Sequence, residues 1–177
     1  MDFSWLIKKI SVEDNTIQEK IHEMVRLIEE TIVSVRRISA NLRPNILDDL
    51  GLVTALQWHS VEVEKRFGIK INFVSEFDVV EVPVATATGL FRIYQEALTN
   101  AVRHANAHQV SSTLQMADNK IILQIQDDGK GMDIDNDLKK KSFGLLGIKE
   151  RAFVMGGQYE LKSEPGKGTR LLVSIPV

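Results

Sequence analysis

The chain has 177 residues, 44% of them hydrophobic, which suits one globular domain of ordinary size with a helical appendage. Its 22 basic and 24 acidic residues leave a net charge of −2, so charge gives no reason to expect nucleic acid or a membrane surface as the main partner. Cysteine is absent, which excludes disulfides, zinc–thiolate sites and thiol catalysis. No apolar run reaches about 18 residues, so any membrane segment is expected outside this chain.

The first third of the chain is predicted to be helical. An amphipathic stretch covers residues 3–10, and Thr16-Ile17-Gln18-Glu19 matches a capping box that begins a longer helix. A lone helix cannot bury the apolar seam that follows, so the pattern favours a dimeric helical bundle over an ordinary core-facing helix. The seam alternates steps of four and three residues, with Thr31 in one slot: Ile17, Ile21, Met24, Ile28, Val35, Ile38 and Leu42.

The remainder of the chain changes to an α/β pattern. Pro44 ends the long helix, a connector covers residues 45–51, and further helices are expected over about 52–67, 84–104 and 146–155. Strands are expected over about 70–74, 109–116, 120–126, 158–163 and 169–175, with a tight turn at Ala117-Asp118-Asn119 between the second and the third. Because the strands come mostly as hairpins, we predict an α+β fold whose mixed or antiparallel sheet carries helices on one face. The predicted boundaries are a helical arm over residues 1–45 and a domain over 46–177.

Three polar residues recur at helical spacing in the stretch around residue 100. Glu96, Asn100 and His104 are spaced i, i+4 and i+8, so they share one face of a helix. A carboxylate can accept a proton from an attacking group, and an asparagine oxygen suits Mg²⁺. The other interpretation is the solvated face of a surface helix.

Three glycine-bearing segments follow. In Asp127-Asp128-Gly129-Lys130-Gly131 the first carboxylate ends a strand, where it can accept a hydrogen bond from an amine such as that of adenine. In Gly144-Leu145-Leu146-Gly147 the glycines precede a helix, whose free N–H groups suit phosphate. The last segment, Gly166-Lys167-Gly168-Thr169, is a turn open to close approach. Taken singly, the first and last are also consistent with plain turns, and none matches a Walker-type loop.

In this order, the four segments resemble the N, G1, G2 and G3 boxes of the GHKL ATPases, which include gyrase, Hsp90, MutL and the histidine kinases. Residues 94–105 resemble the N box of the NarL-type (HPK7) sensor histidine kinases. The run Leu42-Arg43-Pro44, followed by Leu47-Asp48-Asp49-Leu50-Gly51-Leu52, is similar to the second dimerisation helix of that family and its link to the ATPase domain.

The resemblance implies a Bergerat-type α/β sandwich that binds ATP and Mg²⁺. It implies that Asp127 holds the adenine amine through a hydrogen bond supported by a water, and that Asn100 holds Mg²⁺ bound to the triphosphate. It implies that Glu96 is a general base or polariser and that His104 lies near the phosphates. It also implies a set of residues that frame the ATP lid or line the pocket floor: Gly129, Gly131, Gly144, Leu145, Gly147, Gly166, Gly168 and Thr169.

The activity implied is that of a histidine kinase of a two-component phosphorelay, with this fragment in the cytoplasm and any membrane attachment of the full-length protein through segments outside this chain. The γ-phosphoryl group passes to a histidine and then to an aspartate on a response-regulator receiver domain, with a homodimer formed through the arm. The family's phosphoacceptor run, a His-Asp or His-Glu followed by a Leu-Gly-Gln-like segment, is missing from this sequence. Of the four histidines only His22 precedes an acidic residue, and His22 lies on the second helix beside the seam residue Ile21. We therefore expect this fragment to bind Mg·ATP without phosphorylating itself. The alternatives are a non-catalytic dimerisation and docking module, or another GHKL ATPase or serine kinase.

Overall fold

The computed structural model describes residues 24, 28, 45–133 and 143–177. The chain divides into two units, Met1–Pro44 and Asn45–Val177. In the first unit only Met24 and Ile28 are described; both are helical and exposed in the single chain. The rest of the predicted arm and of its heptad seam lies outside the described residues, so the dimerisation hairpin stays a prediction.

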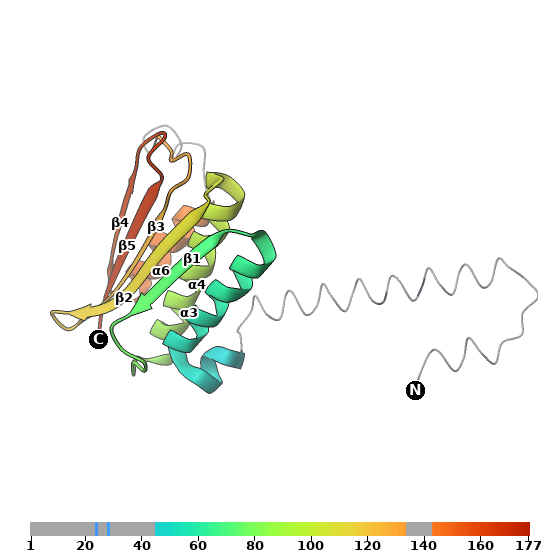
Figure 1. The fold of residues 1–177 in the computed structure, drawn as a ribbon. Helices are drawn as coiled ribbons and strands as arrows, with labels where there is room; N and C mark the ends of the chain where they lie inside the picture. Colours follow the sequence, from blue (N-terminus) through green and yellow to red (C-terminus); the bar gives the residue numbers. More distant parts are fainter. Residues whose placement is uncertain (1–23, 25–27, 29–44, 134–142) are drawn as a thin grey trace, which may run out of the picture. The chain divides into compact units, whose positions relative to one another are not determined.

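The second unit is built on a five-stranded mixed sheet with the order β1-β2-β3-β5-β4 (Figure 1). β1 pairs with β2 in parallel, and the other neighbouring strands pair antiparallel. The tight turn predicted between β2 and β3 is present, with positive φ at Asp118 and Asn119 as a two-residue hairpin turn requires. The strands are β1 (Lys70–Ser75), β2 (Gln109–Ala117), β3 (Lys120–Asp127), β4 (Gln158–Ser163) and β5 (Thr169–Pro176).

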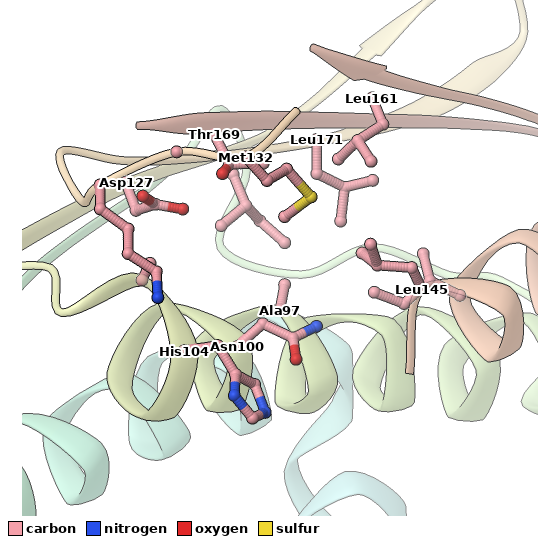
Figure 2. Close-up of a pocket in the computed structure, with 14 residues that line it drawn as sticks. Ala97, Asn100, His104, Asp127, Met132, Leu145, Leu161, Thr169 and Leu171 are labelled. Atoms are coloured by element: carbon pink, nitrogen blue, oxygen red, sulfur yellow. The ribbon is translucent and has the colours of Figure 1, made fainter. Parts of the chain in front are cut away.

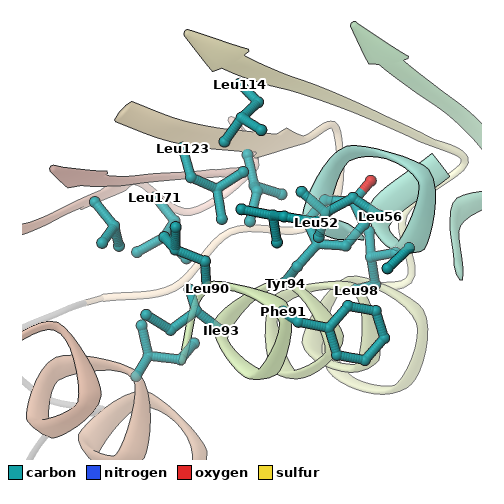
Figure 3. Packing of buried hydrophobic residues seen from close by; sticks show 14 of the residues in the cluster. Leu52, Leu56, Leu90, Phe91, Ile93, Tyr94, Leu98, Leu114, Leu123 and Leu171 are labelled. Atoms are coloured by element: carbon teal, nitrogen blue, oxygen red, sulfur yellow. The ribbon is translucent and has the colours of Figure 1, made fainter. Parts of the chain in front are cut away.

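Three α-helices cover one face of this sheet: α3 (Asn45–Phe67), α4 (Val84–Asn100) and α6 (Phe143–Val154) (Figure 1). Every second residue of the central strands is buried against them, which is the expected pattern for a sheet with one solvated face. α4 lies in the middle of this layer and contributes the largest buried side chains, among them Phe91 and Tyr94 (Figure 3). The predicted α+β fold with a mixed sheet is confirmed. Within the described ranges, no helix has the length and apolar character needed to cross a bilayer.

Two helices differ in detail from the sequence prediction. The connector expected over residues 45–51 is helical, because Leu47 and Leu52 on either side of the kink are both buried in the core. Gly51 interrupts the helix with φ 78° and ψ 178°, a conformation restricted to glycine. The helix expected to end at His104 changes after Asn100 into the π-helical turn η1 (Ala101–Ala105). Such turns are rare and occur frequently at functional sites.

Candidate functional site

A cavity of about 300 Å³ lies between the ends of β3 and β5 on one side and α4, η1 and α6 on the other (Figure 2). Its apolar wall comes from both layers: Ala97, Ala105, Ile125, Met132, Leu145, Ile148, Leu161 and Leu171. The rest of the lining is polar or glycine: Asn100, His104, Asp127, Lys130, Gly131 and Thr169. A mainly apolar cleft with a few convergent polar groups is typical of a small-molecule site.

Asp127 is the last residue of β3, and its register partner in β5 is Thr169, so both side chains reach the pocket together. Burial raises the pKa of the Asp127 carboxyl group, while hydrogen bonds from Gly129 and Thr169 act in the opposite direction. The Gly129 N–H donates to Oδ1 of Asp127 at 2.9 Å. The carboxyl group is therefore half-buried, fixed in direction and available as an acceptor at the pocket floor.

Asn100 faces this floor from the end of α4 (Figure 2). Its Nδ2 is buried and has no hydrogen-bond partner among the described residues. A buried amide group without a partner costs free energy, so this side chain is suited to a polar ligand. Which of its two heavy atoms faces that ligand depends on the ligand, because the amide oxygen and nitrogen are assigned from their partners. His104 also lines the cavity, from η1, and is exposed.

Glu96 lies one helical turn before Asn100 but does not line the cavity. Its carboxylate lies against Gly144 in the first turn of α6, where a Cβ would collide with it. Gly147, one turn further along α6, lies under the guanidinium of Arg151. The N-box acid is thus at the edge of the pocket, between α4 and α6.

The other predicted glycines are packed against protein backbone. A Cβ at Gly168 would collide with the carbonyl oxygen of Asp127, and one at Gly131 with that of Glu164. Gly129 packs in the same way on the Ala105 carbonyl group, which also accepts the Lys130 N–H at 2.8 Å. These glycines therefore hold the Asp127 loop against its neighbours. Gly166 has φ 80° and no atom within 4 Å of a Cβ position.

The sequence prediction missed several pocket residues, and for some a signal existed. Ile125 lies two residues before Asp127 in β3, and Leu171 lies two after Thr169 in β5. Side chains two apart on a strand share a face, so both could have been assigned to the pocket from Asp127 and Thr169. Met132 had no such signal: it lies beyond the Asp127 loop, and its N–H donates to the hydroxyl group of Ser163 at 2.9 Å, which in turn donates to the Gly168 carbonyl group at 2.8 Å.

Known proteins share both this sequence and this fold. The family described as histidine kinase-, DNA gyrase B- and HSP90-like ATPase matches residues 85–177, which include α4, the whole pocket lining and the last four strands. The chain belongs to this family. That assignment confirms the resemblance drawn from the four boxes. It also identifies the pocket as lying in an ATPase domain of the kind found in histidine kinases.

Two curated relatives are histidine kinases by name. The chain is 35% identical over 164 residues to the signal transduction histidine-protein kinase/phosphatase DegS of Brevibacillus brevis, covering 93% of this chain and 42% of that protein. It is also 35% identical over 154 residues to the oxygen sensor histidine kinase NreB of Staphylococcus carnosus, covering 87% of this chain and 43% of that protein. The chain therefore spans less than half the length of these relatives.

Solved structures agree in fold. The histidine kinase domain of the Erythrobacter litoralis EL346 blue-light activated histidine kinase has a TM-score of 0.65 and 24% identity, over 89% of this chain and 84% of that chain. Full-length ShkA, solved in complex with AMPPNP, has a TM-score of 0.57 and 22% identity, over 71% of this chain and 29% of that chain.

Proposed function

We propose that the unit Asn45–Val177 binds Mg·ATP in the described cavity and serves as the catalytic core of a sensor histidine kinase. The observation that carries the proposal is the pairing of two polar groups across an apolar cleft. Asp127 presents a fixed carboxyl acceptor on the sheet side, and Asn100 presents a buried amide without a partner on the helix side. Such a cleft matches a flat, apolar base with an exocyclic amine at one end and a charged group at the other.

Each of these side chains has a specific role in the proposal. The Asp127 carboxylate accepts the adenine amino group, and the apolar wall formed by Ile125 and Leu171 contacts the base. Asn100 directs its amide at the triphosphate end. His104 and Lys130, which also line the cavity, supply donors near the phosphates.

The donor set fits a magnesium ion held mainly by the nucleotide. Mg²⁺ usually binds proteins through one or two oxygens together with substrate phosphates, and the Asn100 amide oxygen is one such ligand. When bound, Mg²⁺ neutralises charge on the phosphates. In phosphoryl transfer the protein contributes mostly positioning and electrostatic stabilisation, and a polar lining within an apolar cleft meets that requirement. Glu96, at the pocket edge, orients or deprotonates the attacking group.

In this proposal the whole protein transfers the γ-phosphoryl group to a histidine and then to an aspartate of a response-regulator receiver domain. A homodimer formed through the arm presents that histidine. The names of the curated relatives and the family assignment support this interpretation. The phosphoacceptor run is absent from these 177 residues, so the chain itself is expected to bind nucleotide and to phosphorylate only a histidine domain supplied separately.

Calorimetric titration of Mg·ATP into the chain tests the pocket assignment. We expect saturable 1:1 binding that weakens about tenfold or more in Asp127→Asn and in Asn100→Ala, because each removes a polar contact in a half-buried site. Asp127→Asn is also expected to reduce the preference for ATP over GTP. A wild-type chain that binds no nucleotide at millimolar concentration, where the binding free energy is only about −4 kcal/mol, would contradict the proposal.

Asp128→Asn is the matched control. Asp128 adjoins Asp127 in sequence but is exposed, and its Oδ1 accepts the N–H groups of His108 and Gln109 at 2.8 and 2.9 Å. It does not line the cavity, so its neutralisation is expected to leave the affinity for ATP unchanged. The chemistry of the transfer product then separates the alternatives. Phosphohistidine is acid-labile and base-stable, phosphoserine is acid-stable, and free phosphate alone indicates an ATPase.

A further inference from the structure

The contact between α4 and α6 is unusually close because glycines lie along it. Gly144 and Gly147 occupy one face of α6, and a Cβ at either would meet a charged side chain. Gly89 of α4 meets the Met155 side chain just beyond α6 in the same way. The helices therefore run antiparallel with little space between them, and charged side chains lie beside buried apolar residues of α6 such as Ile148 and Ala152.

Arg151 is the first unusual group in the seam. It lies four residues after Gly147, and its guanidinium folds back along α6 so that Nη1 lies 2.8 Å from the Cβ position of Gly147. Nη1 is buried and has no hydrogen-bond partner among the described residues. An unpaired, buried donor on a permanently charged group is costly, so the site requires an acceptor.

A second guanidinium makes that requirement stronger. Burial lowers the pKa of Arg92 on α4, and the positive charge of Arg151 lowers it further, which places the two cations close together. Arg92 donates to the neutral Oε1 of Gln95 at 3.0 Å. Within the described ranges neither arginine forms an ion pair. Two neighbouring cations in a half-buried seam attract a carboxylate.

The carboxylate on the same face of α6 is that of Glu96. It rests on Gly144, and Arg151 rests on Gly147, so the two charged groups occupy neighbouring positions of one helical face, whose Cβ sites are about 5–6 Å apart. Glu96 also follows Arg92 by one turn of α4. Within the described residues Glu96 forms no ion pair, so its carboxylate is available to a cation.

We infer that Arg151 is a positioning residue for Glu96: its guanidinium holds the carboxylate at the edge of the nucleotide pocket, directed across the α4–α6 seam. Gly144 and Gly147 are then required because larger side chains would fill the space that the two charged groups share. The consequence for catalysis rests on the proposed function, in which Glu96 acts on the attacking group. The ion pair itself does not depend on it.

A double-mutant cycle between Arg151 and Glu96, followed by urea unfolding, tests this pairing directly. If the two side chains form an ion pair, Arg151→Met is expected to lower the unfolding midpoint more in the wild-type chain than in Glu96→Gln, where the carboxylate is already removed. Arg151→Lys keeps the positive charge and is expected to lose less of this coupling. Lys149 lies over the Phe153 ring, and His104 is exposed, so neither replaces Arg151. The cycle is run without nucleotide and with saturating Mg·AMPPNP.

Arg170→Met is the matched control, since Arg170 is exposed on the solvated face of β5 and donates to Gln124 at 2.7 Å. Its effect on the unfolding midpoint is expected to be the same with and without Glu96→Gln. The inference is overturned if the effects of Arg151→Met and Glu96→Gln are additive in both states, or if Arg92→Met alone shows the coupling to Glu96→Gln. Calorimetry on the same samples reports nucleotide binding separately. A wild-type chain without affinity for nucleotide would refute the proposed function, while the nucleotide-free cycle would still decide the pairing.

Discussion

The hydroxyl group of Tyr94 is expected to be a main stabilising contact between α3, α4 and the sheet. Tyr94 is fully buried on α4, and its hydroxyl group lies 2.7 Å from Oγ of Ser60 on α3 and 2.9 Å from Oγ of Ser112 on β2. Ser60 gives its own proton to the Leu56 carbonyl group at 2.8 Å. Tyr94 therefore donates to Ser60 and accepts from Ser112. Tyr94→Phe removes both hydrogen bonds without changing the ring.

The expected cost follows from what the two serines can still do. Each buried neutral hydrogen bond contributes about 0.5–1.5 kcal/mol, so the pair is worth about 1–3 kcal/mol. Ser60 keeps its bond to Leu56, and Ser112 retains a longer contact of 3.4 Å to the Asn72 carbonyl group. Neither is left without a partner, which places the loss in the lower part of that range, about 1–2 kcal/mol.

Urea unfolding followed by the fluorescence of Trp58, which lies on α3, measures this loss as a lower midpoint with an unchanged slope. Tyr159→Phe is the matched control. Tyr159 of β4 is half-buried, burial raises the pKa of its hydroxyl group to about 12, and that hydroxyl group has no hydrogen bond among the described residues. Its removal is expected to cost less than about 0.5 kcal/mol. Equal losses in the two variants would refute the assignment of Tyr94 as a polar link between the layers.

Three further predictions use the same assay. Burial raises the pKa of Asp127, so the native state binds the carboxyl proton more tightly than the unfolded chain, and the ionised group lowers stability once the pH exceeds the folded-state pKa. Asp127→Asn is therefore expected to unfold at a higher urea concentration at pH 7. An unchanged or lower midpoint would argue against the cost of burying this charge. Burial lowers the pKa of His59 to about 4, so the unfolded chain takes up a proton first, and stability is expected to fall by up to about 3 kcal/mol as the pH drops from 6.5 through 4. His59→Gln is expected to remove this pH dependence. An NMR titration that places the pKa of His59 near its ordinary value would contradict the prediction. Gly168→Ala forces a Cβ against the Asp127 carbonyl oxygen, whereas Gly166 has the same sign of φ but open space around the Cβ position. Gly168→Ala is therefore expected to lower the free energy of unfolding clearly more than Gly166→Ala. Similar losses of stability in the two variants would show that the positive φ alone determines the cost.

Local sequence patterns predicted the strands well because each pattern has one physical cause. Alternating burial defined β3 and β5 to within one residue, and the polar turn residues Asp118 and Asn119 fixed the register of the β2–β3 hairpin. The π-helical turn over residues 101–105 could not be predicted in this way. Its sequence suits an ordinary helix, and the contacts around it come from residues far along the chain. Gly129 packs on the Ala105 carbonyl group, which also accepts the Lys130 N–H.

The same distinction applies to the candidate site. The helical spacing of the N box and the strand-end position of Asp127 are local features, and they were enough to indicate two sides of one pocket. The glycines were expected to leave room for a ligand; Gly131, which lines the cavity, and Gly168 also allow backbone segments to meet, which depends on tertiary contacts. The unpaired guanidinium of Arg151 had no sequence signal either, because an arginine near the end of a helix is ordinarily solvated.

The polar groups of the site come from the ends of elements whose middle sections form the core. Asp127 ends β3, Thr169 begins β5, and Asn100 ends α4, while the buried residues of the same elements, such as Leu123, lie further from the cavity. Loss of ligand affinity and loss of stability are therefore expected from different substitutions. Asp127→Asn should reduce nucleotide affinity while the fold is retained, whereas Tyr94→Phe should lower stability through the core of α4. If Tyr94→Phe also weakens nucleotide binding more than its stability loss explains, then the position of α4 on α3 influences the site.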